Sequence, residues 1–168
     1  MNTNTAGLCG AIVVAIIMQI MYKKLDLTMI LNGALGGLVA VTAGPDLYDI
    51  YTPILIGSVG GILVVIGVSF FDKLKIDDPV GALSVHLLNG IWGTVAVGLF
   101  ASNGDDITLL GQLKGIIVVA IFAFVSSYII LYIINKIMPL RAGNDEEMQG
   151  LDVEECGIEA YPEFKRAF

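Results

Sequence analysis

The sequence predicts an all-α, polytopic membrane protein, for three reasons. The 168-residue chain is 56% hydrophobic, with a mean hydropathy of +0.82, whereas soluble domains are about 45–50% apolar. The apolar residues lie in long runs that charged residues do not interrupt, which is typical of helices that span a bilayer. The charged residues between these runs also divide consistently between the two sides of a five-helix arrangement.

The first two transmembrane helices are expected at residues 5–22 and 28–44. The first apolar run ends at Lys23-Lys24 and lacks a small-residue cleavage motif, so we interpret it as a membrane span and not as a signal peptide. The second expected helix is the shortest, and it carries a GxxxG motif that begins at Gly33. Small residues at this spacing let neighbouring helix backbones approach closely.

The third, fourth and fifth transmembrane helices are expected at residues 53–71, 79–101 and 113–138. Each range is near the length of about 20 residues that crosses about 30 Å of hydrocarbon. The connecting segments are short and rich in Gly, Pro, Asn and Asp, which favour turns. Residues 1–139 are therefore expected to form a transmembrane domain and residues 140–168 a C-terminal tail.

The basic residues give these helices a direction. Eight of the nine Lys and Arg residues lie on the side that carries the tail, and only Lys114 lies on the other side. The positive-inside rule then predicts a cytoplasmic C-terminus and an external N-terminus. The tail-side residues are Lys23, Lys24, Lys73, Lys75, Lys136, Arg141, Lys165 and Arg166, and the opposite loops hold Asp46, Asp49, Asp105 and Asp106.

The charged and reactive residues exclude several classes of function. The net charge is −7, and residues 140–168 contribute −5 of it through eight acidic and three basic side chains. No basic face is available to neutralise phosphates, so no nucleic-acid partner is expected. One His and two distant thiols, Cys9 and Cys156, predict free cysteines and no metal site. No nucleophile–base pair and no phosphate-binding glycine loop are visible, so neither an enzyme nor a cofactor is expected.

The fourth expected helix has a polar start. Asp78 is predicted to be its N-cap, where a carboxylate accepts unpaired backbone N–H groups. Pro79 suits the first helical position because its missing N–H is no loss there. Asp77 adds a second negative charge at the positive end of the helix dipole. These three residues are expected to act as a structural cap.

His86 is the one histidine of the chain, and it lies inside the expected span 79–101, which holds no Asp, Glu, Lys or Arg. Burying a polar group in hydrocarbon is costly unless the group is paired. On a regular α-helix, His86 shares one face with Asn89, Gly90, Gly93 and Val97. An imidazole, an amide and small residues on one face suit a pore or substrate path, and they also suit a plain hydrogen bond between helices. The residues alone leave both interpretations open.

The tail carries residues that indicate more than a solvated acidic segment, although such a segment is the alternative. Asn144 is expected to cap a short amphipathic helix, with Glu147 three residues later. A turn and several apolar residues follow, which suggests that the tail docks. The candidate tail residues are Gly150, Leu151, Asp152, Gly157 and Tyr161.

Four segments form a recognisable set. Asp77-Asp78-Pro79 is followed by Val85-His86, Gly90-Ile91-Trp92-Gly93 and Gly98-Leu99-Phe100-Ala101. The tail holds Gly150-Leu151-Asp152, Gly157 and Glu159-Ala160-Tyr161, and residues 2–6 and 32–42 add two further stretches. In chain order starting from residue 2, these segments resemble the seventh, eighth and tenth helices and the C-terminal signature of the ammonium transporter (Amt/Mep/Rh) family. Four motifs in the right order are specific.

The resemblance implies an eleven-helix ammonium transporter fold, in which the five expected helices are the seventh to the eleventh. It implies that His86 is the second of two pore histidines, with Asn89 and Gly90 beside it on the path. In such proteins ammonium is recruited outside, loses its proton and crosses as ammonia. A complete transporter is expected to be a homotrimer in the plasma membrane. Its regulatory tail would dock on the cytoplasmic face and offer a site to a nitrogen-regulatory protein of the PII type.

The chain also departs from the family pattern. It has no first pore histidine and lacks the N-terminal half, so we expect it to be inactive alone. Gly81 stands where an acid is often found after the Pro, and Cys156 stands where His is usual. Because Met1 lies directly on the seventh-helix motif, a truncated or split reading frame is favoured over a natural half-transporter. The alternatives are a non-transporting membrane sensor or assembly subunit derived from the same half, and an unrelated small channel or transporter subunit.

Overall fold

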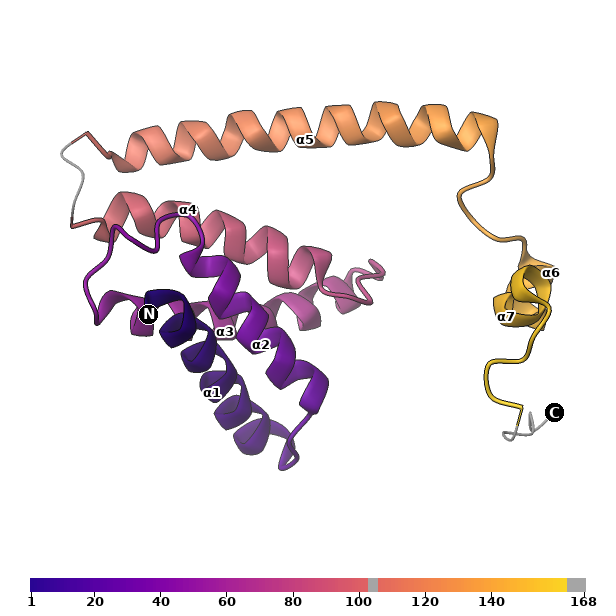
Figure 1. Ribbon diagram of the computed structural model, residues 1–168, viewed down its shortest axis with the longest axis horizontal. Helices are drawn as coiled ribbons and strands as arrows, with labels where there is room; N and C mark the ends of the chain where they lie inside the picture. Colours follow the sequence, from indigo (N-terminus) through magenta and orange to yellow (C-terminus); the bar gives the residue numbers. More distant parts are fainter. Residues whose placement is uncertain (103–105, 163–168) are drawn as a thin grey trace. The chain divides into compact units, whose positions relative to one another are not determined.

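The structure is a computed structural model that describes residues 1–102 and 106–162. It divides the chain into two compact units, Met1–Val119 and Ala120–Phe168. The described residues form helices and turns, with no strand among them (Figure 1). The expected all-α class is therefore confirmed.

Three helices form the centre of the first unit. These are α1 (Asn2–Tyr22), α2 (Leu27–Val41) and α3 (Thr52–Lys73), and each packs against the other two (Figure 1). A further helical segment begins with a wide π-helical turn, Ala82–Leu87, and continues as α4 (Leu88–Phe100). This segment packs against α2 and α3. The fully buried apolar side chains among the described residues of the unit are Ala6, Val14, Ala40, Val41, Pro53, Ile56, Val64, Val85 and Ala96.

Local sequence explains where the helices begin and end. The Asp26 carboxylate accepts the Met29 backbone N–H at 3.0 Å, so α2 begins at Leu27, one residue before the expected start. The same helix ends at Val41, three residues early, because the chain turns at Thr42. α1 begins at Asn2 instead of residue 5.

Four described helical segments are long and apolar enough to cross a membrane: Asn2–Tyr22, Thr52–Lys73, Ala82–Phe100 and Leu109–Ile137. The second expected span, which corresponds to α2, is apolar but has only 15 residues. At about 1.5 Å per residue it is about 22 Å long, which is less than the hydrocarbon thickness of about 30 Å. The sequence overestimated its length because residues 42–44 are apolar or small but lie in a turn.

Glycines bring the backbones of α1, α2 and α3 into direct contact. A methyl group on Gly37 of α2 would collide with the carbonyl of Ala6 on α1, and one on Gly57 of α3 would collide with the same carbonyl. A methyl group on Gly61 would lie 2.6 Å from the Gly10 carbonyl oxygen. The GxxxG motifs of α2 and α3 therefore both face α1, as small-residue packing between membrane helices requires.

The last long helix, α5 (Leu109–Ile137), begins in the first unit and continues into the second. It starts four residues before the expected position of 113. The loop before it contains Asp105, and the end of the tail contains Lys165 and Arg166. These three charges, which the orientation prediction used, lie outside the described residues.

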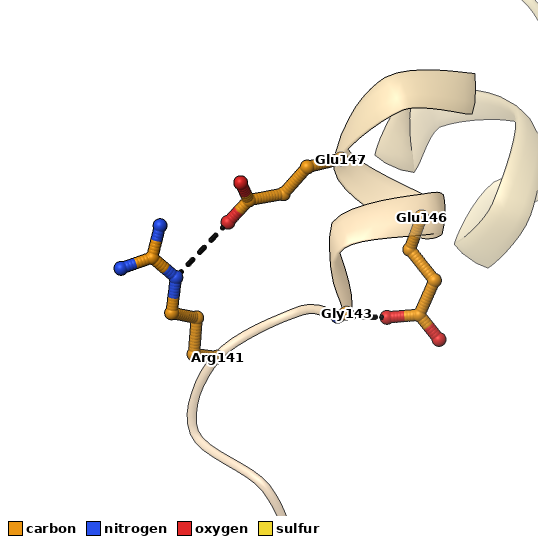
Figure 2. A network of polar contacts seen from close by, with 4 residues as sticks. All are labelled: Arg141, Gly143, Glu146 and Glu147. Atoms are coloured by element: carbon orange, nitrogen blue, oxygen red, sulfur yellow. Dashed lines mark hydrogen bonds and ion pairs between the residues drawn. The ribbon is translucent and has the colours of Figure 1, made fainter.

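The described tail contains two short helices, α6 (Asn144–Gln149) and α7 (Leu151–Cys156). The expected cap at Asn144 is wrong, because the residue at the N-cap of α6 is Gly143 and Asn144 is the first helical residue. Gly143 has no side chain to cap with, and Glu146 instead reaches back to accept the Gly143 N–H at 2.6 Å (Figure 2). Glu147 pairs with Arg141 at 3.1 Å in the same network, and this ion pair is exposed (Figure 2).

Candidate functional site

The Asp78 carboxylate caps the N-terminal end of the helical segment Ala82–Phe100. Its two oxygens accept the backbone N–H of Leu83 at 3.1 Å and the backbone N–H and hydroxyl of Ser84 at 2.9 and 2.8 Å. Partial burial acts to raise the pKa of Asp78, but the hydrogen bonds from Ser84 and Leu83 outweigh it, so the pKa lies below its usual range. Asp78 therefore caps the helix as a charged group.

The capping residue does not occupy the expected position. Asp78 was predicted at the N-cap with Pro79 as the first helical residue, but the helix begins at Ala82 and Gly81 is its N-cap. Pro79 lies in a turn that separates the carboxylate from the helix, and Asp77 is exposed in the loop before it. The carboxylate still reaches the free N–H groups because the chain folds back through Gly81, whose φ of 75° favours glycine.

The first turns of this segment are wider than those of an α-helix. The backbone N–H groups of Val85 and His86 both donate to the Gly81 carbonyl, at 2.9 and 3.2 Å. The Leu88 N–H donates to the Leu83 carbonyl, five residues back. Bonds of this i→i−5 type define a π-helical turn, a feature frequently found at functional sites. His86 lies within this turn.

The imidazole of His86 is exposed on the surface of the first unit. Gly90 follows one turn later on α4, and open space surrounds the position that a side chain would take there. His86 and Gly90 therefore lie on the same uncovered side of the helix. The ring is available to groups outside this unit.

Asn89 lies on a different side of the helix. Its side chain is fully buried, and its Nδ2 donates to the Val85 carbonyl at 2.9 Å. Gly93 and Val97 are also buried, and a methyl group on Gly93 would collide with the Ala40 carbonyl of α2. The expectation that Asn89, Gly93 and Val97 share a face with His86 is therefore wrong. The α-helical spacing behind it does not hold across a π-helical turn.

Two polar contacts that the sequence did not indicate join distant segments of the first unit. Asn2 Nδ2 donates to the carbonyls of Pro45 and Tyr48 at 2.9 and 3.1 Å, which ties the start of α1 to the loop after α2. Trp92 Nε1 donates to the Ile56 carbonyl at 3.1 Å, which ties α4 to α3. Backbone carbonyl acceptors in distant segments leave no pattern in the sequence, so these contacts were not predictable.

The candidate tail residues fall on a compact turn around α7. Gly150 and Gly157 flank this helix with φ of 101° and 67°. The Asp152 carboxylate accepts the Ala160 N–H at 2.9 Å, and the Asp152 carbonyl accepts the Ile158 N–H at 3.2 Å. Leu151 is the first residue of α7, and Tyr161, which lies just beyond this turn, is exposed.

Comparison with known proteins adds a consistent result. The model of the Ammonium Transporter Family matches residues 1–161. The ammonium transporter Amt2 of Archaeoglobus fulgidus is 33% identical over 97% of the chain. The ammonium transporter of Bacillus subtilis is 33% identical over 95% of it. The solved structure of a sensor Amt protein covers 92% of the chain with a TM-score of 0.82 and 31% identity.

The match covers only part of these proteins. The chain spans 38% of the length of the Archaeoglobus protein, 43% of the Bacillus protein and 40% of the solved sensor chain.

Proposed function

Because the chain belongs to the Ammonium Transporter Family, we propose that it forms the C-terminal part of a transporter that conducts ammonium or ammonia across the membrane. The observation that carries the proposal is the placement of His86. The chain has one histidine, and its ring is exposed at a π-helical turn inside an apolar segment long enough to span a bilayer. A polar ring at that depth needs a partner outside this unit.

The chemistry of the imidazole suits ammonia. A neutral imidazole offers one hydrogen-bond donor and one acceptor, which is sufficient to hold ammonia or relay a proton. A bare ammonium ion faces a large desolvation cost in a passage removed from water. The path beside His86 therefore favours the neutral species, and Gly90 leaves room for it one turn away.

The other half of the path comes from segments outside this chain. The relatives are more than twice as long as the matched region, and the exposed side of His86 is where those segments would lie. The chain alone is expected to be inactive for this reason. The complete protein is expected to be a homotrimer in the plasma membrane, as the family resemblance implies.

The orientation follows from the loop charges. Lys23, Lys24, Lys73 and Lys75 lie at one end of the first unit's helices, and Asp46 and Asp49 lie in the loop between α2 and α3. The positive-inside rule supports a cytoplasmic C-terminus. The tail is then accessible to a PII-type protein, with Gly150, Leu151, Asp152, Gly157 and Tyr161 as the regulatory residues.

The test is complementation. The chain is expressed together with the part of the Bacillus subtilis transporter that precedes the matched region, in cells that lack ammonium transport. We expect uptake of methylammonium only when both parts are present, and loss of that uptake with His86→Ala. Thr94→Val is the control, because it removes a side chain-to-backbone bond to Gly90 on the same helical segment and leaves the imidazole of His86 in place. Uptake by the His86→Ala pair at the unsubstituted level would refute the proposal.

A second candidate function is a membrane sensor or assembly subunit built from the same part. The observation that favours it is the likeness to the solved sensor Amt protein. A sensor predicts binding of ammonium without uptake. If cells that carry both parts do not accumulate methylammonium, but membranes prepared from them bind it, the sensor function would be favoured.

A further inference from the structure

Asn89 is a polar residue where an apolar one is expected. Among the described residues, Asn89 and Ser84 are the polar side chains that are fully buried in the core. Ser84 is held by Asp78, as described above. The Oδ1 of Asn89 has no hydrogen-bond partner. An unpaired buried oxygen costs stability, so packing alone does not explain the residue, since leucine has a similar shape and no such cost.

The Asn89 amide fixes the peptide unit that leads into His86. Its Nδ2 donates to the Val85 carbonyl at 2.9 Å. The N–H of the same peptide unit belongs to His86, and it donates to the Gly81 carbonyl at 3.2 Å. Both ends of the Val85–His86 peptide are thus bonded. The Cα of His86 follows this peptide directly, so the direction of the imidazole depends on it.

Two glycines on neighbouring helices hold the Asn89 amide in place. A methyl group on Gly36 of α2 would lie 3.0 Å from Nδ2, and one on Gly60 of α3 would lie 2.9 Å from Oδ1. The amide is therefore seated against the backbones of two other helices. The amide therefore joins the backbones of α2 and α3 to the peptide before His86.

We infer that Asn89 is a positioning residue for His86, which sets the direction of the imidazole through the Val85 carbonyl. The importance of this role for conduction rests on the proposed function. The positioning itself is a property of this chain and is testable without transport.

The chain carries its own two reporters. It has one His and one Trp, so labelling these residues with ¹⁵N gives single signals for the His86 backbone amide and the Trp92 indole. The first reports the peptide beside Asn89. The second reports α3–α4 packing, because the indole N–H is bonded to the Ile56 carbonyl. The experiment compares the full chain in detergent micelles with its Asn89→Leu and Asn89→Ala variants.

We expect both variants to shift the His86 amide signal and to speed its hydrogen exchange up to about tenfold, the scale of one lost hydrogen bond. The Trp92 indole signal stays in place. Thr94→Val is the matched control, because it removes another bond to a carbonyl four residues back, at Gly90, on the same helix. An unchanged His86 signal in both variants would overturn the inference. Equal shifts of the His86 and Trp92 signals would also overturn it, because Asn89 would then serve only helix packing.

Transport separates this inference from the proposed function. In the complemented transporter, Asn89→Leu is expected to lower methylammonium uptake about tenfold while leaving membrane insertion unchanged. If His86→Ala also abolishes uptake, both ideas stand. If His86→Ala has no effect but the His86 signal still depends on Asn89, the conduction role fails and the positioning role stands.

Discussion

The carboxylate of Asp78 bonds both the backbone N–H and the hydroxyl of Ser84, at 2.9 and 2.8 Å. With the bond to the Leu83 N–H, it satisfies two of the free backbone donors at the start of the segment Ala82–Phe100. The π-helical turn that contains His86, Ala82–Leu87, also contains Leu83 and Ser84, the two residues that Asp78 bonds. The hydrogen bonds of Asp78 to Leu83 and Ser84 therefore connect a charged side chain at the end of the span to the turn that contains His86.

Loss of the Asp78 carboxylate and its hydrogen bonds should destabilise the folded chain. We expect Asp78→Ala to lower the free energy of unfolding at neutral pH by about 1 kcal/mol, the usual effect of losing a capping side chain. Thermal unfolding in non-ionic detergent measures it. Asp77→Ala, an exposed neighbour of the same charge, is the control and should have little effect.

The Asp78 carboxylate also makes the free energy of unfolding depend on pH in the acidic range. The pKa of Asp78 is lowered in the folded chain, so its contribution is complete above the unfolded value of about 3.9 and is lost as the pH falls through the folded value. The stability difference between the unsubstituted chain and Asp78→Asn should therefore shrink below about pH 4. A difference that stays constant from pH 6 to pH 2 would contradict this role.

Tyr48 predicts a response to alkali. Burial raises its pKa to about 12, and its hydroxyl has no hydrogen-bond partner. The unfolded chain releases this proton near pH 10, so folding stability should fall as the pH rises from about 10 to about 12. Tyr48→Phe should remove that part of the fall without loss of stability at pH 7. Parallel unfolding curves of the two chains above pH 10 would show that the hydroxyl is not buried.

Close helix packing predicts a steep cost for larger side chains at the three-helix contact. Gly57→Val places atoms on the Ala6 carbonyl, and we expect a loss of about 1–3 kcal/mol in unfolding free energy. Gly115→Val is the matched control, because open space surrounds that position of α5. Equal effects of the two substitutions would mean that α1 and α3 do not meet as described.

The tail should loosen when Asp152 is truncated. Asp152→Ala removes the acceptor of the Ala160 N–H, so amide exchange in residues 157–161 should rise several-fold, as expected for a lost hydrogen bond. Hydrogen–deuterium exchange with mass spectrometry measures this change. Glu154→Ala, which removes another acidic side chain of α7, serves as the control. An unaltered exchange pattern would argue against the compact turn.

The sequence indicated the all-α class and the approximate positions of the helices because long apolar runs and short polar turns are local signals. It also identified Asp78 and His86 as a cap and a candidate path residue, since a charge beside a proline and a lone imidazole in an apolar run are conspicuous. It did not predict the π-helical turn. That turn depends on Gly81 adopting positive φ and on Asp78 reaching forward past Pro79, and the Asp-Pro pattern equally fits an ordinary cap.

The sequence did not predict which side of the helix Asn89 occupies, for a different reason. The Asn89 amide packs against Gly36 and Gly60, which belong to two other helices and lie far from it in the sequence. A helical face drawn from residue spacing contains no information about which neighbour supplies the space. The contact of Gly36 and Gly60 with Asn89 depends on how the three helices pack, which the sequence spacing does not give.

The backbone contact among α1, α2 and α3 limits how this part of the molecule moves. No long side chains separate Gly37 and Gly57 from Ala6, so no layer of rotatable groups is available to absorb sliding of one helix along another. The three helices are expected to move as a single body. Opening or closing of a path beside His86 would then come from rotation of side chains, or from displacement of elements outside this trio.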